Sequence, residues 1–173
     1  PLRPQVLFQL GVAYNAAEQL DQAKAALEEV AVLFPEHEIA PLALYQIGVF
    51  FYERKDYSRM AAALEHLVQT FPNCAQVADA YFWMGWIAQQ DNQYDEAVAN
   101  FTLCVEANPH YANAAECLFS IAQCHKDKAA KMGLPTVLSE ARRAEYRAIM
   151  MDAAIAYEDL LINYPDSDRA QEA

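Results

Sequence analysis

Apolar residues recur at helical spacing along most of the chain, and the helical segments come in pairs. The clearest pair predicts one helix over residues 41–54 and a second over 58–70. On the inward faces we expect Leu44, Ile47 and Phe51 in the first helix, and Met60, Leu64 and Leu67 in the second. Residues 55–57 form the predicted turn, and Ser58 is the predicted N-cap of the second helix. Pro72 follows the second helix because proline cannot continue it.

This pair repeats every 37 residues along the chain. Pro35, Pro72 and Pro109 have that spacing, and so do the small residues of a glycine column. The column is Gly11, Gly48 and Gly85, continued by Ala122, and an aromatic residue precedes each by three positions: Phe8, Tyr45, Phe82 and Phe119. Repetition of this period is typical of helical repeat proteins. The sequence therefore predicts four two-helix units, at about residues 4–37, 41–74, 78–111 and 115–167.

The fourth unit departs from the repeat. Its closing proline is expected near residue 146 but occurs as Pro165, which indicates an insert at about 129–147. The Gly-Leu-Pro sequence at 133–135 predicts a helix stop and a turn. A long helix should then run from residue 136 or 139 to Asn163, and its first turns should overhang the hairpins or fold back on them. The residues expected on its apolar stripe are Leu138, Ala141, Ala148, Met151, Ile155 and Leu161.

Two alanines near the end of the sequence continue the repeat. Ala170 and Ala173 follow Pro165 at the distances at which Ala40 and Ala43 follow Pro35. A fifth unit is therefore expected to begin there, and the chain is expected to be a fragment of a longer protein.

The repeated positions resemble the tetratricopeptide repeat. The first unit carries that pattern in Leu10-Gly11-x-x-Tyr14, Ala23, Leu27, Val30 and Pro35, and the third carries it in Tyr94-x-x-Ala97-x-x-x-Phe101 and Pro109. The resemblance implies an all-α fold, a right-handed α-α superhelix of four hairpins over residues 1–173. The long spacing is similar to that of bacterial envelope proteins, such as the lipoprotein of the outer-membrane assembly machine and the periplasmic partner of the Tol–Pal system. It slightly favours the bacterial periplasm or envelope over the cytoplasm.

Charge narrows the range of partners. The 173 residues carry 12 Lys and Arg against 24 Asp and Glu, a net charge of −12. An acidic surface repels phosphate backbones, so nucleic acid is not an expected partner. No apolar run is long enough to cross a bilayer, so membrane insertion is not expected either.

Positive charge is concentrated in and around the insert. Its main members are Lys126, Lys131, Arg142, Arg143 and Arg147. They indicate either a solvated face paired with acids such as Glu140 and Glu145, or a secondary docking patch for an acidic partner or another copy.

The sequence shows no constellation for catalysis. It has no glycine-rich phosphate loop and none of the common hydrolase or zinc-protease motifs. The four cysteines are expected to be free thiols that are mostly buried, and a metal site built from Cys117, Cys124 and His110 is the minor alternative. We therefore expect neither an enzyme nor a cofactor.

The family resemblance implies a concave surface lined by the first helix of each unit. The residues assigned to partner binding are Tyr45, Val49, Tyr52, Phe82, Trp86, Gln89, Phe119 and Gln123. Phe8 and Phe119 could instead be packed between units. A carboxylate clamp is disfavoured because Lys126 is the one basic residue in these columns.

Two functions are suggested by this surface and by the charge pattern. The first is a scaffold that binds a protein or peptide segment with apolar anchors in the aromatic groove. The alternative is a structural array that self-assembles, with the acidic body of one copy against the basic overhang of another.

Overall fold

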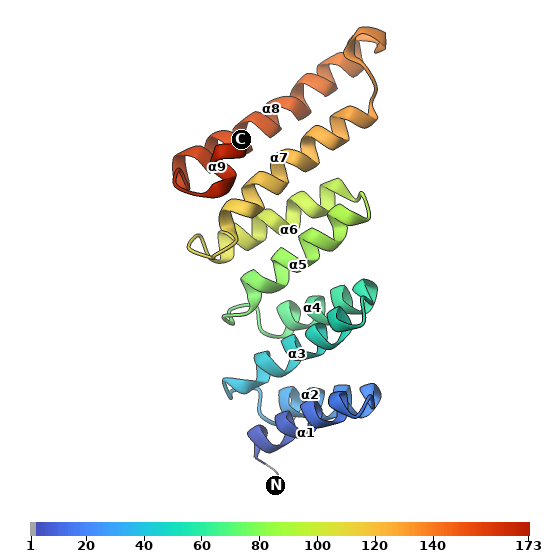
Figure 1. Cartoon of the computed structure of the whole chain (residues 1–173), viewed down its shortest axis with the longest axis vertical. Helices are drawn as coiled ribbons and strands as arrows, with labels where there is room; N and C mark the ends of the chain where they lie inside the picture. The colour runs from blue at the N-terminus through green and yellow to red at the C-terminus, as the bar shows by residue number, and fades with distance from the viewer. Residues whose placement is uncertain (1–2) are drawn as a thin grey trace. The chain divides into compact units, whose positions relative to one another are not determined.

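The computed structural model describes residues 3–173, and every regular element within them is helical. Figure 1 labels the helices. The chain divides into two compact units, Pro1–Ala80 and Tyr81–Ala173. The first contains α1 (Pro4–Ala16), α2 (Leu20–Leu33), α3 (Ile39–Glu53), α4 (Tyr57–Thr70) and the start of α5 (Val77–Gln90). The second contains the rest of α5, α6 (Tyr94–Ala107), α7 (Ala114–Lys131), the 3-10 helix η1 (Pro135–Val137), α8 (Glu140–Asn163) and α9 (Asp168–Glu172). The predicted fold class, all-α and built of helical hairpins, is confirmed.

The core of the first unit lies between successive antiparallel helices. α1 packs on α2, α3 packs on α4, and α2 packs on α3. The largest fully buried side chains there include Leu27, Leu44, Phe50, Leu64 and Leu67. Leu44, Leu64 and Leu67 are at inward positions of the repeat, so the predicted apolar faces are the faces that pack.

Each hairpin of the regular part turns through one residue with left-handed backbone. These residues are Glu18, Lys55 and Asn92, with φ of 61°, 57° and 59°, and they stand 37 positions apart. A residue in this conformation ends the first helix and reverses the chain.

The cap of α4 differs from the prediction. The Asp56 carboxylate accepts a hydrogen bond from the Arg59 backbone N–H at 3.2 Å, so Asp56 is the N-cap and not Ser58. The helix begins one residue earlier than the pattern indicated, at Tyr57, which places Ser58 inside its first turn.

The glycine column marks the close approach of the two helices in each regular hairpin. A Cβ built on Gly11 would lie 2.6 Å from Cγ of Leu27, and one on Gly85 would lie 2.8 Å from the Phe101 ring. On Gly48 the nearest atom would be a Leu64 methyl carbon at 3.0 Å. The column is glycine because the facing helix occupies the space of a side chain.

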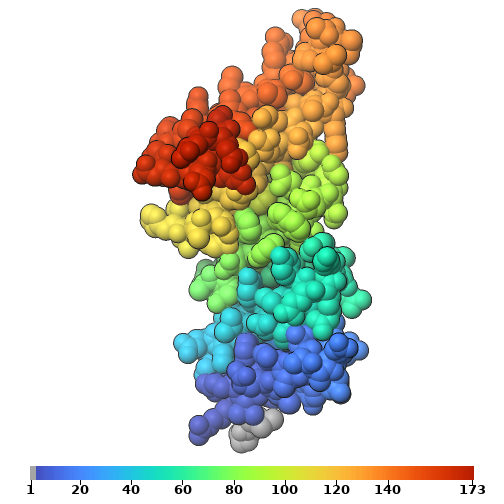
Figure 2. All heavy atoms as spheres, viewed as in Figure 1, coloured from blue at the N-terminus to red at the C-terminus, as the bar shows by residue number. Residues whose placement is uncertain are grey.

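The fourth hairpin is extended, as the spacing of its proline indicated. α7 runs to Lys131, the chain turns at Gly133 with φ of 92°, and α8 has 24 residues, roughly 36 Å at 1.5 Å per residue. The Ser139 hydroxyl caps α8 by accepting from the Arg142 backbone N–H at 3.4 Å. The far end of this hairpin, residues 132–147, projects past the turn between α5 and α6 (Figures 1 and 2), and we call it the tip.

The apolar stripe predicted for α8 is wrong in register. Of its six residues only Leu138, which precedes the helix, is buried. Met151, Ile155 and Leu161 are 62%, 49% and 46% exposed, and Ala141 and Ala148 are exposed too. The buried residues of α8 are Ile149, Ala153, Ala156 and Leu160. Apolar residues stand on more than one side of α8, and small alanines, which let it approach its neighbours, decide which side packs.

A fifth helix begins where the sequence predicted it. α9 starts after Ser167, whose hydroxyl accepts from the Ala170 backbone N–H at 3.2 Å. Arg169 pairs with Glu116 of α7, which ties α9 to the first helix of the fourth hairpin.

Candidate functional site

Three of the predicted binding residues lie along α3 in the first unit. Tyr45 and Val49 are half-buried, and Tyr52, one turn further on, is 43% exposed. The Tyr52 ring lies 6.4 Å from the Tyr57 ring at the start of α4. An exposed tyrosine offers a partner both apolar area and a hydroxyl group, which suits it to an interface.

Three more lie along α5, and all are half-buried: Phe82, Trp86 and Gln89. The Phe82 ring packs 6.2 Å from the buried Phe101 of α6 and 6.0 Å from Tyr111, which precedes α7. Phe82 therefore holds the third hairpin to the connection between α6 and α7. The Trp86 ring meets the Trp83 ring edge-on at 5.9 Å, so the two form one half-buried aromatic pair.

Trp83 was not among the residues assigned to partner binding from the repeat. The positions equivalent to it in the other hairpins are Gln9, Gln46 and Ser120, which are all polar. A tryptophan in a polar column is a departure from the repeat, and that departure is the signal that could have identified it.

The remaining two predicted binding residues lie on α7 and contact the chain's own later helices. The Phe119 ring lies 5.9 Å from the Tyr157 ring of α8, and the Gln123 side-chain amide donates to the Tyr157 hydroxyl at 2.8 Å. The Arg169 guanidinium also contacts this cluster, 4.7 Å from the centre of the Phe119 ring. Tyr157 and Arg169 thus cover part of the surface assigned to a partner, and both follow the insert in the sequence.

The predicted secondary docking residues divide into two groups. Lys126 lies over the Tyr157 ring at 5.6 Å, and Lys131 lies over the Tyr94 ring at 4.6 Å. Arg142, Arg143 and Arg147 are exposed on the tip. Within residues 3–173 none of these three forms an ion pair, so the pairing with Glu140 and Glu145, one of the two alternatives, is not found there.

The cysteines are free thiols, as expected, and Cys104, Cys117 and Cys124 are buried. A hydrogen bond with Cys104 and then burial raise the pKa of the Cys117 thiol well above its ordinary value. Burial raises the pKa of Cys124 to about 12, with a smaller contribution from Asp127. In the described part of the chain no three His, Cys, Asp or Glu side chains are grouped to hold a metal ion. His110 is exposed whereas Cys117 and Cys124 are fully buried.

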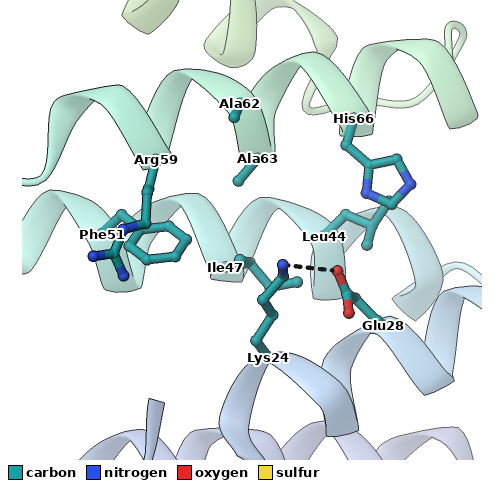
Figure 3. Close-up of a pocket in the computed structure, with 9 residues that line it drawn as sticks. All are labelled: Lys24, Glu28, Leu44, Ile47, Phe51, Arg59, Ala62, Ala63 and His66. Carbon is teal, nitrogen blue, oxygen red and sulfur yellow. Dashed lines mark ion pairs between the residues drawn. The ribbon is translucent and has the colours of Figure 1, made fainter. Parts of the chain in front are cut away.

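A second kind of surface lies between the second helices of consecutive hairpins, with a first helix as its floor. In the first unit a pocket of about 240 Å³ lies between α2 and α4 over α3 (Figure 3). Its rims carry both signs of charge: Lys24 pairs with Glu28 at 3.5 Å, and the Arg59 guanidinium lies 5.5 Å from the centre of the Phe51 ring.

The equivalent surface in the second unit is larger and differently charged. We call it the α6–α8 groove: a hollow of about 390 Å³ between these helices over α7, adjoined by a second of about 370 Å³ with which it shares Val105, Leu118 and Asp159. Val98 and Thr102 stand where Lys24 and Glu28 stand two repeats earlier. Its acids are Glu106, Asp152 and Asp159, and no described Lys or Arg lines either hollow.

No described helix combines the length and apolar character needed to cross a membrane.

Comparison with known families identifies the repeat. A family profile described as tetratricopeptide repeat matches residues 5–37 and 42–73, and a second profile of the same description matches 78–111. Together these ranges cover more than half of the chain and correspond to the hairpins α1–α2, α3–α4 and α5–α6. The matched ranges do not include the α7–α8 hairpin, whose helices are separated by the insert.

Solved structures with a similar fold come from several proteins. MamA 41-end from Desulfovibrio magneticus RS-1 is 19% identical, with 96% of this chain and 78% of that chain covered and a TM-score of 0.55. Pseudomonas aeruginosa pilF is 17% identical, with 98% and 65% covered and a TM-score of 0.56. The apo form of RapI is 13% identical, with 95% and 43% covered and a TM-score of 0.60.

Identities this low show the fold alone. A search of curated protein sequences found no match. The resemblance to the outer-membrane assembly lipoprotein and the Tol–Pal partner is not confirmed by these comparisons.

Proposed function

We propose that this chain, which belongs to the tetratricopeptide-repeat family, is a scaffold for protein–protein interaction. Tetratricopeptide-repeat proteins generally bind proteins or peptides and are generally not enzymes. The observation that carries the proposal is the presence of accessible aromatic residues on two first helices, each taken by itself: Tyr52 is exposed on α3, and Trp86 is half-buried on α5. Tyrosine and tryptophan are among the residues most enriched at the energetic centres of protein interfaces.

The partner segment we expect has apolar anchors and basic flanks. Tyr45, Val49 and Tyr52 on α3 form one contact surface, and Trp86 and Gln89 on α5 form another. The net charge of −12 attracts a basic segment and speeds its association. Phe119 and Gln123 should contribute less, because Tyr157 already occupies them.

The two tryptophans provide a direct assay of the α5 surface. They are the only ones in the chain, and both lie on α5, so intrinsic tryptophan fluorescence reports on that helix alone. A protein captured by the tagged chain would be purified and titrated against it. We expect the emission to shift on binding, and we expect Trp86→Ala to weaken binding roughly 30-fold, which is the loss of about 2 kcal/mol typical of an aromatic anchor.

Two variants serve as controls for this assay. Tyr52→Ala tests the α3 surface, and Tyr146→Ala removes a half-buried ring of α8 that lies outside both surfaces. The aromatic surfaces are refuted if Trp86→Ala and Tyr52→Ala are folded and both bind the partner as tightly as Tyr146→Ala does. The scaffold itself is refuted if the chain captures no protein under any condition.

A second candidate function, self-assembly, is favoured by the tip. It projects past the α5–α6 turn and carries arginines that form no ion pair within the described residues. Such a surface can dock on the acidic body of another copy. Sedimentation of the purified chain over a range of concentrations tests this function, and a chain that stays monomeric throughout excludes it.

A further inference from the structure

Charge in the second unit is strongly segregated. Residues 126–147 carry six Lys and Arg against three Asp and Glu. Residues 81–125 carry five Asp and Glu and no Lys or Arg, and residues 148–173 carry six Asp and Glu against Arg169 alone. One end of the unit is therefore positive and the rest is negative, which is the arrangement of two complementary surfaces on one molecule.

The positive end also presents apolar side chains. In the tip Leu134 is 71% exposed and Val137 is 77% exposed, on either side of Pro135 and Thr136. Arg142 and Arg147 are exposed on the adjoining turns of α8. Arg143 has a local role, because its Nε donates to the Leu138 carbonyl at 2.9 Å and so holds the turn before α8.

The α6–α8 groove has the complementary composition. Its floor is Leu118 and Ile121, its α8 rim includes Ile155 at 49% exposure, and its acids are Glu106, Asp152 and Asp159. An apolar hollow with acidic rims suits a segment that has aliphatic side chains between basic ones.

The tip cannot fill the groove of its own molecule. Both surfaces include parts of the same straight helix: Arg142 and Arg147 stand in its first turns, and Asp152, Ile155 and Asp159 stand further along. From Arg142 to Ile155 the helix rises about 20 Å, at 1.5 Å per residue. A contact between tip and groove therefore joins two molecules.

We infer that the tip of one copy docks in the α6–α8 groove of another, with Leu134 and Val137 in the hollow and Arg142 and Arg147 against the acids. This inference rests on the second candidate function and names its acceptor surface. Because the two surfaces differ, the contact is heterologous, so each copy can bind one neighbour on each side and form open chains or a closed ring.

Complementation between two variants tests the inference with the full chain. Ile155→Lys places a positive charge in the groove and leaves the tip intact, whereas the double variant Arg142→Glu/Arg147→Glu reverses the tip and leaves the groove intact. Val32→Lys is the matched control, since Val32 is 75% exposed on α2 in the other unit. Each variant would be checked by circular dichroism and followed by sedimentation.

The expected pattern is specific. The wild type and Val32→Lys should associate as concentration rises, and salt near 1 M should weaken this by shortening the screening length to about 3 Å. Ile155→Lys and the tip variant should each raise the dissociation constant at least ~10-fold. Their mixture should form one-to-one dimers, in which the intact tip of Ile155→Lys docks in the intact groove of the tip variant. Nothing larger should form, because the groove and the tip that remain free in such a dimer are the altered ones.

Three results overturn the inference, and they separate it from self-assembly itself. If the wild type stays monomeric, both the inference and self-assembly are refuted. If the tip variant is monomeric while Ile155→Lys associates as the wild type does, the tip docks elsewhere and the groove is not its acceptor. If association survives in both variants, a different surface joins the copies.

Discussion

The glycine column allows one substitution to be compared at three equivalent sites. Replacing Gly11, Gly48 or Gly85 by alanine adds the same methyl group where the first helix of a hairpin faces the second. In a helix interior this change gains about 1 kcal/mol of stability from backbone entropy. Overpacking a tight contact costs about 1–3 kcal/mol, so the surroundings of each glycine decide the sign.

The contacts rank the three sites. At Gly11 the new Cβ would lie 2.6 and 2.8 Å from two Leu27 atoms and 3.1 Å from the Ala23 carbonyl oxygen, which is backbone and cannot move aside. We expect the full cost of about 3 kcal/mol there and a net loss of about 2 kcal/mol. At Gly48 the nearest atoms, at 3.0 and 3.3 Å, belong to the flexible Leu64 side chain, so cost and gain should nearly cancel.

Gly85 should fall between these two. Its Cβ would meet three atoms of the Phe101 ring at 2.8–3.0 Å, and that ring is 1% exposed and packs against Phe82. A flat, enclosed ring can move aside less than a leucine methyl group can, so we expect a net loss of stability of about 1–2 kcal/mol.

Urea unfolding followed by circular dichroism measures the free energy of unfolding of each variant. The slope against urea concentration must be compared as well, because a change in slope would mean that unfolding is no longer two-state or that the compactness of the folded or unfolded state has changed. The reasoning is refuted if Gly48→Ala destabilises the chain as much as Gly11→Ala does, since helix approach would then not control the cost.

Three further predictions concern turns, caps and thiols. Lys55→Gly should stabilise the chain by about 1 kcal/mol in thermal unfolding, because its left-handed backbone strains any residue with a side chain, and Asn92→Gly should gain less because asparagine tolerates that conformation. Ser139→Ala should cost about 1 kcal/mol by removing the N-cap of α8, measured by urea unfolding. Burial raises the pKa of Cys124 to about 12, whereas the thiol of the unfolded chain ionises near pH 9. Below pH 9 the thiol is neutral in both states, and between pH 9 and 12 it ionises in the unfolded state only, which lowers the free energy of unfolding as pH rises. The free energy of unfolding should therefore depend less steeply on pH over that range in Cys124→Ala than in the wild type.

The regular hairpins could be predicted from the sequence because their local and long-range signals agree. Proline ends the second helix, glycine permits the close approach, and the apolar positions fall on the packed faces. Leu27, Leu64 and Phe101 are each fully or almost fully buried opposite a glycine, as the aligned columns implied. The N-cap of α4 was predicted wrongly because Asp56 and Ser58 lie close together and both residue types can cap a helix, so the sequence pattern could not distinguish them.

The candidate site was less predictable than the fold. A column in an alignment states that residues are equivalent in the repeat, but their exposure depends on which other segments pack over them. Phe119 is equivalent to Tyr45 and Phe82, and its ring lies against Tyr157 and under the Arg169 guanidinium, two residues that follow the insert in the sequence. Trp83 was missed for the opposite reason, because it departs from its own polar column.

The tip arises from a change at one repeated position. Residues 18, 55 and 92 reverse the chain with left-handed backbone, but the next position in that series is Ala129, which is helical and fully buried. A buried alanine cannot adopt the left-handed conformation without strain and loss of packing, so α7 continues to Lys131 and the chain reverses at Gly133, four residues later. The added turn places Lys131 over the Tyr94 ring and pairs Lys128 with Asp95, so α6 supports it. Beyond that support the chain has passed the end of the α5–α6 hairpin, so its exposed leucine, valine and arginines are available to another molecule.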